Sequence, residues 1–276
     1  MNIMKRLFLS FFAAMLLLGS SCKPYVIIQV ADAQLGFHAS NLSSKTGTPY
    51  VNDLSFESEY LRKAVSLINE LSPDVVVFTG DQVHRSDDQE QWDALKEIVS
   101  EINDDIKVYH LPGNHDIICS EGKVDSTPFT DRFGADRFLH CEAGVRIVGI
   151  NTNLVKNNDP SEYEQFEWMK AALKKESPAE VSLVFGHHPY FITDIDEPDS
   201  YFPIMSSKRR LYFDMFAEMS VDAVYAGHLH DSSSSEFHGI PMKTATSVAF
   251  QLGKSKPSIR VITVDRETVV DELVEL

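Results

Sequence analysis

The stretch Leu111-Pro112-Gly113-Asn114-His115-Asp116 decides the fold. It places an amide, an imidazole and a carboxylate on one turn, directly after an expected strand at residues 107–111. Four other polar motifs follow apolar runs in the same way. Open α/β sheets gather their ligands just past the carboxyl ends of their strands. The five motifs together therefore indicate one shared site on an α/β protein.

The other four motifs supply carboxylate, amide and imidazole side chains. An aspartate at a strand end is more often a turn former or helix cap than a ligand, so the first two motifs are informative only beside the others. A His-x-His pair that leaves a strand puts both imidazoles on the same side of the chain. The motifs are Asp32-Ala33-Gln34, Gly80-Asp81, Gly186-His187-His188-Pro189 and Gly227-His228-Leu229-His230.

Apolar runs alternate with amphipathic stretches from residue 25 onward, which is typical of an α/β protein. The patterns predict strands at residues 25–31, 74–79, 107–111, 145–151, 181–186, 222–226, 241–245 and 259–264. They predict helices at residues 56–71, 89–102 and 208–219, and one that begins at Asp159-Pro160. Residues 35–55, 117–140 and 190–207 are expected to be long loops, and residues 232–235 a plain turn.

Composition limits the class of protein. With 276 residues and 43% hydrophobic content, the chain can bury a sizeable core, and we expect one catalytic domain over residues 23–276. The formal net charge of -16 argues against nucleic acid as a stable partner, because such a site needs a basic surface. It suits a protein that collects divalent cations, although acidic charge also serves solubility alone.

Residues 1–22 have the pattern of an export signal. Lys5 and Arg6 precede an apolar run at residues 7–18, which is too short for a membrane span, so we expect a signal peptide. Small residues lead into Cys22 as in a bacterial lipoprotein signal. We expect export to the periplasm or cell envelope with a lipid anchor at Cys22 as the only membrane contact; ordinary cleavage near Ser21 is the alternative. Whether Cys119 and Cys141 pair stays open.

In their order and placement, the five motifs resemble the calcineurin-like metallophosphoesterase superfamily over nearly the whole chain after residue 22. More narrowly, the chain resembles the calcineurin-like phosphoesterase domain-containing protein 1 group of serine/threonine phosphatases. That likeness rests on Ala31-Asp32-Ala33-Gln34-Leu35-Gly36, Tyr201-Phe202 and Gln251-Leu252-Gly253. The resemblance implies a four-layer α/β/β/α fold, with two central mixed β-sheets flanked by helices.

The resemblance also implies two divalent metal ions, which could be Mn, Mg, Fe, Zn or Ca. It assigns Asp81 as the bridge between them, Asp32 and His230 with nearby Gln34 to the first site, and Asn114, His187 and His228 to the second. His187 is chosen over His188 because the family pattern is His-x-Pro. His188 is then expected to face away or line the pocket, in a structural or a functional role.

Gln34 departs from the commoner superfamily pattern, which has histidine at this position. A neutral oxygen donor should shift the first site toward Mg²⁺, Mn²⁺ or Ca²⁺ and away from iron or zinc. The alternative is that Gln34 only hydrogen-bonds a water on the metal.

The implied reaction is hydrolysis of a phosphomonoester by attack of a metal-bound hydroxide. We expect His115 to protonate the leaving group or stabilise the transition state, with Asp116 orienting its imidazole. The alternative is that His115 caps the turn. Arg85 is a candidate phosphate contact, and His84 could line the pocket or support a ligand.

The sequence is compatible with three functions. The first is a phosphomonoesterase on a phosphorylated small molecule or phosphoprotein. The second is a phosphodiesterase on nucleotides or lipid head groups, and the third is a non-catalytic metal-binding surface lipoprotein, which only Gln34 favours. Residues 190–207 are acidic and aromatic. They could favour a basic or peptide-like substrate, or form a solvated loop.

Overall fold

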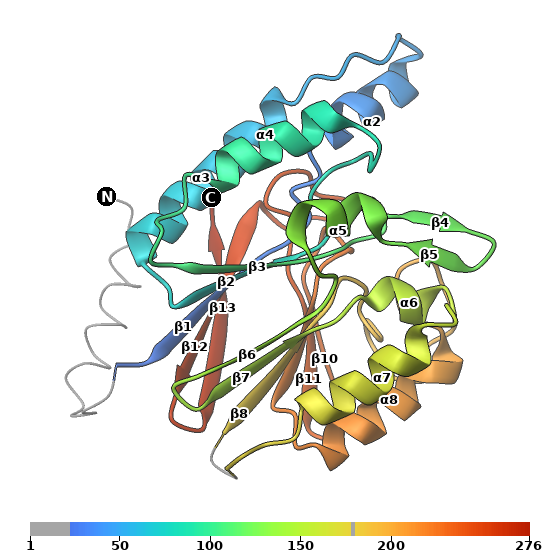
Figure 1. Cartoon of the computed structure of the whole chain (residues 1–276). Helices are drawn as coiled ribbons and strands as arrows, with labels where there is room; N and C mark the ends of the chain where they lie inside the picture. The colour runs from blue at the N-terminus through green and yellow to red at the C-terminus, as the bar shows by residue number, and fades with distance from the viewer. Residues whose placement is uncertain (1–22, 178–179) are drawn as a thin grey trace.

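Two large β-sheets stack face to face at the centre of the molecule (Figure 1). The structure is a computed structural model that describes residues 23–177 and 180–276, so the expected signal peptide and lipid anchor lie outside the described residues. The first sheet has the order β13-β12-β1-β2-β3 and the second the order β10-β11-β9-β8-β7-β6. Their strands are β1 (Tyr25–Val30), β2 (Val75–Thr79), β3 (Lys107–Leu111), β6 (Phe138–Glu142), β7 (Val145–Gly149), β8 (Val181–Phe185), β9 (Ala223–Ala226), β10 (Ser233–Phe237), β11 (Ile240–Thr244), β12 (Ser258–Asp265) and β13 (Thr268–Glu275).

Both sheets are mixed, and each contains a run of neighbouring parallel strands. In the first sheet β1, β2 and β3 run parallel, and β12 joins β1 in the antiparallel sense. In the second sheet β7, β8, β9 and β11 run parallel, while β6 and β10 add antiparallel edges. The carboxyl ends of parallel strands share one edge of a sheet, so the polar motifs that follow β1, β2, β3, β8 and β9 are brought toward one region.

Successive residues of the central strands face opposite layers. Ile27 and Val77 point between the two sheets, whereas Ile28 and Phe78 point toward the outer helices. This period of two lets each strand contribute to two apolar layers, which is why its sequence reads as a continuous apolar run. All four residues are buried.

Helices cover the outer face of each sheet (Figure 1). The helices α3 (Ser55–Leu71) and α4 (Gln89–Val99) pack against the first sheet through residues such as Leu61 and Trp92. The helices α7 (Glu162–Ala172) and α8 (Ser206–Glu218) pack against the second through residues such as Met169 and Phe213. The predicted four-layer α/β/β/α fold is confirmed. No helix in residues 23–177 and 180–276 has the length and apolarity to span a membrane.

Capping residues set where the helices begin. Asp88 accepts hydrogen bonds from the backbone N–H groups of Glu90 (3.1 Å) and Gln91 (3.2 Å), so α4 begins at Gln89. The helix predicted from Asp159-Pro160 begins later, at Glu162. Asp159 instead accepts from the N–H of Ser161 and forms a turn ahead of the helix.

Three segments that were expected to lack regular structure contain it. Residues 35–55 include α2 (Phe37–Thr46), which buries none of its residues and so has no apolar stripe to reveal it. Residues 117–140 include the hairpin β4 (Ile118–Ser120) and β5 (Lys123–Asp125), the helix α5 (Thr127–Phe133) and the start of β6. The expected turn at residues 232–235 forms most of β10, a serine-rich edge strand paired with β11. The short helix α6 (Thr152–Lys156) and the strand β13 were also not predicted.

The two cysteines of the described part of the chain, Cys119 and Cys141, are exposed and unpaired. Cys119 and Cys141 therefore form no disulfide with each other.

Candidate metal centre

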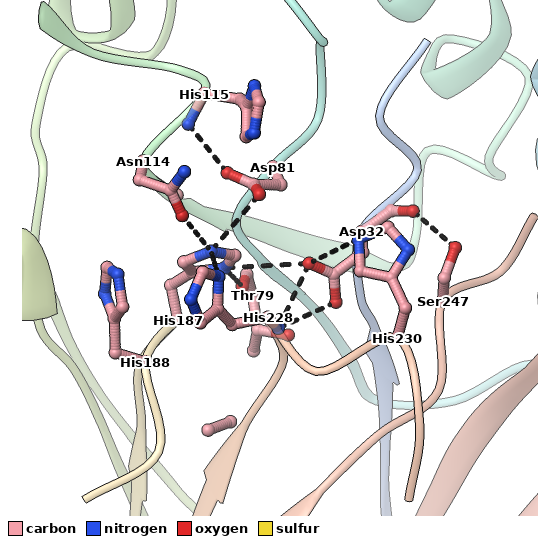
Figure 2. Close-up of polar contacts among 12 residues, drawn as sticks. Asp32, Thr79, Asp81, Asn114, His115, His187, His188, His228, His230 and Ser247 are labelled. Carbon is pink, nitrogen blue, oxygen red and sulfur yellow. Dashed lines mark hydrogen bonds and ion pairs between the residues drawn. The ribbon is translucent and has the colours of Figure 1, made fainter. Parts of the chain in front are cut away.

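The five motifs meet where the carboxyl ends of the two sheets face each other (Figure 2). Asp32 follows β1, Asp81 follows β2, and Asn114 follows β3, while His187 and His228 follow β8 and β9. Backbone hydrogen bonds tie the turns together. The N–H of Asp32 donates to the carbonyl of Gly80 at 3.2 Å, and the N–H of Gly227 donates to the carbonyl of His187 at 3.0 Å.

Five of the seven predicted metal ligands have left-handed backbone conformations. Their φ angles run from 40° to 70°, at Asp32, Gln34, Asp81, His228 and His230. Such angles are uncommon for non-glycine residues and cost free energy, so they persist where surrounding structure demands them. They turn the chain sharply at the strand ends and bring side chains from separate strands toward one point.

Glycines allow these turns to pack closely. A Cβ atom on Gly113 would overlap the Oδ1 and backbone nitrogen of Asp81. A Cβ atom on Gly227 would lie 2.7 Å from Oδ2 of Asp32. Gly113 and Gly227 are therefore required by the close approach of the carboxylates.

One half of the site is built from Asp81, Asn114, His187 and His228. The Nε2 atom of His187 lies 3.1 Å from Oδ1 of Asn114, 3.1 Å from Nδ1 of His228 and 3.4 Å from Oδ2 of Asp81. Asp81 and His187 are buried. Four potential ligand atoms thus converge on one point, as the binding of a cation requires.

The orientation of His187 is fixed from behind. Its Nδ1 donates to the carbonyl of Thr79 at 2.9 Å, which leaves Nε2 turned toward the ligand cluster. The hydroxyl of Thr152 accepts from the backbone N–H groups of His187 (3.1 Å) and His188 (2.9 Å). The ring position, and the tautomer that the neutral ring adopts once it has lost a proton, are therefore set before any ligand binds.

The other half of the site is built from Asp32, Gln34 and His230. The Nε2 atom of His230 lies 3.7 Å from Oδ1 of Asp32, and its Nδ1 lies 2.5 Å from the carbonyl oxygen of Phe250. Gln34 is 3% exposed, and its Oε1 has no hydrogen-bond partner among the described residues. A buried, unpaired carbonyl oxygen is costly and would be satisfied by a cation.

Burial and charge perturb the pKa values of this cluster. Burial alone would lower the pKa of His187, but Asp81 and Asp32 raise it to about 9. Burial raises the pKa of Asp32 to about 6. Burial and the neighbouring His187 lower the pKa of His228 to about 2. Burial and the close approach of carboxylates and imidazoles thus together set the charges of these ligands.

Groups that could hold a cation are found at two overlapping places among the described residues. Ligand atoms of Asp32, Asp81 and His187 lie within 4.8 Å of one another, as do those of His187, His188 and His228. Together with the unpaired Oε1 of Gln34, this donor set of carboxylates, amides and imidazoles suits a pair of divalent cations.

His188 lies in the cluster, with its ring 4.9 Å from that of His187. Its ring is 4.4 Å from the ring of His228, and its Nδ1 is 3.2 Å from the hydroxyl of Thr152. It is buried, and burial lowers its pKa well below the ordinary value. His188 therefore lines the site and does not face away from it.

His115 lies beside Asp81, but Asp116 does not orient it. The backbone N–H of His115 donates to Oδ1 of Asp81 at 2.8 Å, and its Nδ1 lies 2.8 Å from the carbonyl oxygen of His84. The His84 ring stacks on the His115 ring at 5.0 Å. His84 therefore orients the His115 imidazole, the role that was expected of Asp116.

Asp116 has a different task in the turn. It is fully buried, and its carboxylate accepts hydrogen bonds from the backbone N–H groups of Gly113, Gln82 and Val83 at 2.8 to 3.1 Å. Burial and the nearby Asp81 raise its pKa to about 7. The expected catalytic role is corrected: Asp116 ties the turn after β3 to the turn after β2, because backbone amides use its oxygens.

Arg85, the candidate phosphate contact, has its guanidinium paired with a neighbouring carboxylate. Its guanidinium pairs with Asp87, with Nε 3.3 Å from Oδ1 and Nη2 3.3 Å from Oδ2, and half of its side chain is exposed. His84 is more deeply placed, and burial and His115 lower its pKa to about 4. A neutral His84 can stack on His115 without repelling it.

Sequence reasoning missed the groups that support the ligands. The carbonyls of Thr79 and Phe250 fix His187 and His230, and the hydroxyl of Ser247 donates to the carbonyl of Asp32 at 2.7 Å. Any residue can supply a carbonyl, so no side-chain motif marks these positions.

The fold and the cluster define a metal-dependent hydrolase of phosphate esters. The chain belongs to the calcineurin-like phosphoesterase family, whose model matches residues 27–232. Enzymes of this family use a dinuclear metal centre, and the candidate ligands are present here. The sequence is similar to Serine/threonine-protein phosphatase CPPED1 of Rattus norvegicus, at 25% identity over 258 residues that cover 90% of this chain and 82% of the rat protein.

Solved structures share the fold. A dimetal phosphatase from Danio rerio matches with a TM-score of 0.58 and 14% identity, covering 90% of this chain and 98% of that one. A purple acid phosphatase from yellow lupin seeds matches with a TM-score of 0.67 and 11% identity. The match covers 91% of this chain, which spans about half the length, 51%, of the lupin chain.

Proposed function

We propose that this chain is a phosphomonoesterase that acts on phosphoserine and phosphothreonine in proteins. The observation that carries the proposal is the convergence of the strand-end ligands on one buried point, with Nε2 of His187 between Asn114, His228 and Asp81. The choice of substrate is supported by the relatives named as serine/threonine-protein phosphatases, which match 90% of the chain.

The proposed ligand sets follow from the two halves of the site. Asp32, Gln34 and His230 would hold one divalent cation, and Asn114, His187 and His228 the other, with Asp81 shared between them. When bound, such a pair supplies an ionised water near neutral pH and positive charge beside the phosphoryl oxygens.

His115 is the proposed proton donor to the leaving oxygen. Its Nδ1 is occupied by the His84 carbonyl, so proton transfer would use Nε2. Its backbone N–H to Asp81 places the ring at the edge of the ligand cluster. Stacking on His84 keeps the ring in this orientation.

The test is an assay of the Mn²⁺-loaded protein with an aryl phosphate, a bis-aryl phosphate and a phosphoserine peptide. We expect turnover of the two monoesters and much slower turnover of the diester. Asn114→Ala should lower turnover at least about 100-fold, since even groups that only support a ligand are worth about 10- to 100-fold.

The matched control is Asn103→Ala, at an exposed asparagine in the turn after α4. It should leave turnover unchanged. Preference for the diester would replace the proposal with a phosphodiesterase. No turnover of any ester with Mn²⁺, Mg²⁺, Zn²⁺ or Fe²⁺ would contradict enzymatic function altogether.

A further inference from the structure

The segment between β8 and α8 carries two aromatic side chains to the metal centre. We call residues 189–205 the aromatic arm. The ring of Tyr201 lies 5.3 Å from the ring of His228, and the ring of Phe202 lies 5.5 Å from it. The two aromatic rings meet edge to face, 5.2 Å apart. Together the two rings cover one side of His228, a candidate metal ligand.

A buried arginine holds the arm in place. Arg209 is fully buried, and its Nε donates to the carbonyl of Ile204 at 2.7 Å. Its Nη1 donates to the carbonyl of Glu197 at 2.5 Å, and its Nη2 lies 3.5 Å from a carboxylate oxygen of Asp199. A buried guanidinium whose donors are used in this way fixes the backbone around it.

A lysine holds the part of the arm next to the aromatic pair. The Nζ atom of Lys156 donates to the carbonyl of Ser200 at 3.2 Å and to the carbonyl of Pro203 at 2.6 Å. These two carbonyls flank Tyr201 and Phe202 in sequence. The aromatic pair is therefore preorganised, which lowers the entropic cost of any contact that it makes.

Tyr201 stays largely exposed although its position is fixed. The residue is 65% exposed, among the highest values for large apolar residues in residues 23–177 and 180–276. An aromatic ring held at the mouth of a ligand cluster, with one face open, is a surface for a bound molecule. The arm thus differs from a solvated loop.

The Tyr201 hydroxyl has a proton to give. Burial and the charge of Asp81 raise the pKa of this hydroxyl, and the neighbouring Asn114 side chain partly offsets that rise. Asn114 turns its Oδ1 toward His187, at 3.1 Å from Nε2, which leaves the amide nitrogen as the Asn114 group that can donate to the Tyr201 hydroxyl. The phenolic O–H then remains available for an acceptor beside Asn114. Phosphoryl oxygens bound at this centre are such acceptors.

We propose that Tyr201 contacts the substrate, with its hydroxyl donating to a non-bridging phosphoryl oxygen and its ring packing against the group esterified to the phosphate. Phe202 supports the ring and completes this wall. The inference rests on the proposed phosphoesterase function and adds a residue that binds phosphate without holding metal.

The experiment compares Tyr201→Phe and Tyr201→Ala with the wild-type protein, all loaded with Mn²⁺. Tyr201→Phe removes only the hydroxyl and keeps the packing on His228. We expect it to weaken the binding of inorganic phosphate, measured by calorimetry, and to lower kcat/KM for aryl phosphate, each by about 10- to 100-fold. The metal content should stay equal to that of the wild type.

Tyr201→Ala should add a second effect that depends on the leaving group. Loss of the ring should reduce kcat/KM for an aryl phosphate more than for an alkyl phosphate, because only the aryl group can stack. The matched control is Tyr163→Phe, at a tyrosine on α7 that is 73% exposed. It should behave as the wild type.

Three results would overturn the inference. One is unchanged phosphate affinity in Tyr201→Phe. Another is loss of metal from Tyr201→Phe, which would mean that the hydroxyl serves the ligand Asn114 and not the substrate. The third is an equal loss for aryl and alkyl phosphates in Tyr201→Ala. If the wild-type protein hydrolyses no ester, the proposed function fails, while the phosphate titration still decides whether Tyr201 binds the anion.

Discussion

At the scale of single residues, Gln34 has a buried side-chain oxygen with no hydrogen-bond partner among the described residues. Leaving such a group unpaired costs about 1–3 kcal/mol. A bound cation would offset that cost. The second interpretation, a hydrogen bond to a water on the metal, leaves Gln34 outside the ligand set but uses the same oxygen.

Gln34→Leu tests which of these holds. It keeps the bulk of the side chain and removes the oxygen. We expect the protein to retain one metal ion per chain after dialysis where the wild type retains two, because the first site should weaken by about 10- to 100-fold. The measurement is elemental analysis, with the exposed Gln89→Leu as control. Two ions per chain in Gln34→Leu would mean that Gln34 is not a ligand.

Metal binding should depend on pH through His187. Asp81 and Asp32 outweigh the effect of burial and raise its pKa to about 9 in the metal-free protein. A metal ligand must be a neutral imidazole, so below that pH a proton has to leave before the metal binds. Apparent affinity for Mn²⁺ should therefore rise with pH toward about 9. Calorimetry in buffers of different ionisation enthalpy should detect the released proton; affinity independent of pH would contradict the prediction.

The side chains of the candidate site could be found from the sequence, and their supports could not. Asp32, Asp81 and Asn114 follow apolar runs, so their position at a strand end is readable from hydrophobic pattern. The sequence predicts that Asp116, the neighbour of His115 in the chain, orients its imidazole. In the folded turn its oxygens meet backbone amides of another strand end, a long-range contact that adjacency does not reveal.

At the scale of elements, the turns after the strands position the ligands. The closest contact between two of these turns is the one between Gly113 and Asp81. The Gly113 hydrogen faces the carboxylate and backbone nitrogen of Asp81, with no room for a methyl group. The turn after β3 and the turn after β2 therefore support each other. Gly113→Ala should push Asp81 out of position.

We expect Gly113→Ala to lower stability by about 1–3 kcal/mol, as overpacking of a filled site does, and to abolish binding of at least one metal ion. Denaturant unfolding and elemental analysis measure the two effects. The control is Gly144→Ala, where φ is 78° but a Cβ would meet nothing within 4 Å. Equal metal content in Gly113→Ala and Gly144→Ala would show that the close approach does not hold the ligand.

Elements with an apolar face could be predicted, and those without one could not. The apolar stripe of α4, which includes the buried Trp92 and Leu95, predicts a helix at the right place. The helix begins at Gln89 as expected, but it ends at Val99 and not at residue 102. Helix α2 buries nothing, so no period marks it. The serines of β10 are typical of turns, and only pairing with β11 makes them a strand.

At the scale of the whole molecule, the layer between the two sheets joins both halves of the metal centre. Ile27 and Val77 from the first sheet pack there with Leu183, Phe185 and Tyr225 from the second. The ring of Phe185 stacks on that of Tyr225 at 5.2 Å. Because each sheet brings part of the ligand set, the separation of the sheets fixes the distance between the two halves of the site.

Phe185→Ala should destabilise the whole molecule by about 3–5 kcal/mol, since the side chain is fully buried and a cavity would remain. Unfolding in denaturant should stay a single transition at lower midpoint. Tyr163→Ala, at an exposed position, should change stability little. Two separate transitions in Phe185→Ala would show that each sheet is stable without the other, against a shared core.

The central claim is that Asp81 joins two metal ions between the sheets. Anomalous X-ray diffraction from crystals grown with Mn²⁺ tests it most directly. We expect two peaks about 3.5–4 Å apart with the Asp81 carboxylate between them. One peak beside Asn114, His187 and His228, and none beside Asp32 and His230, would contradict the claim and leave a mononuclear site.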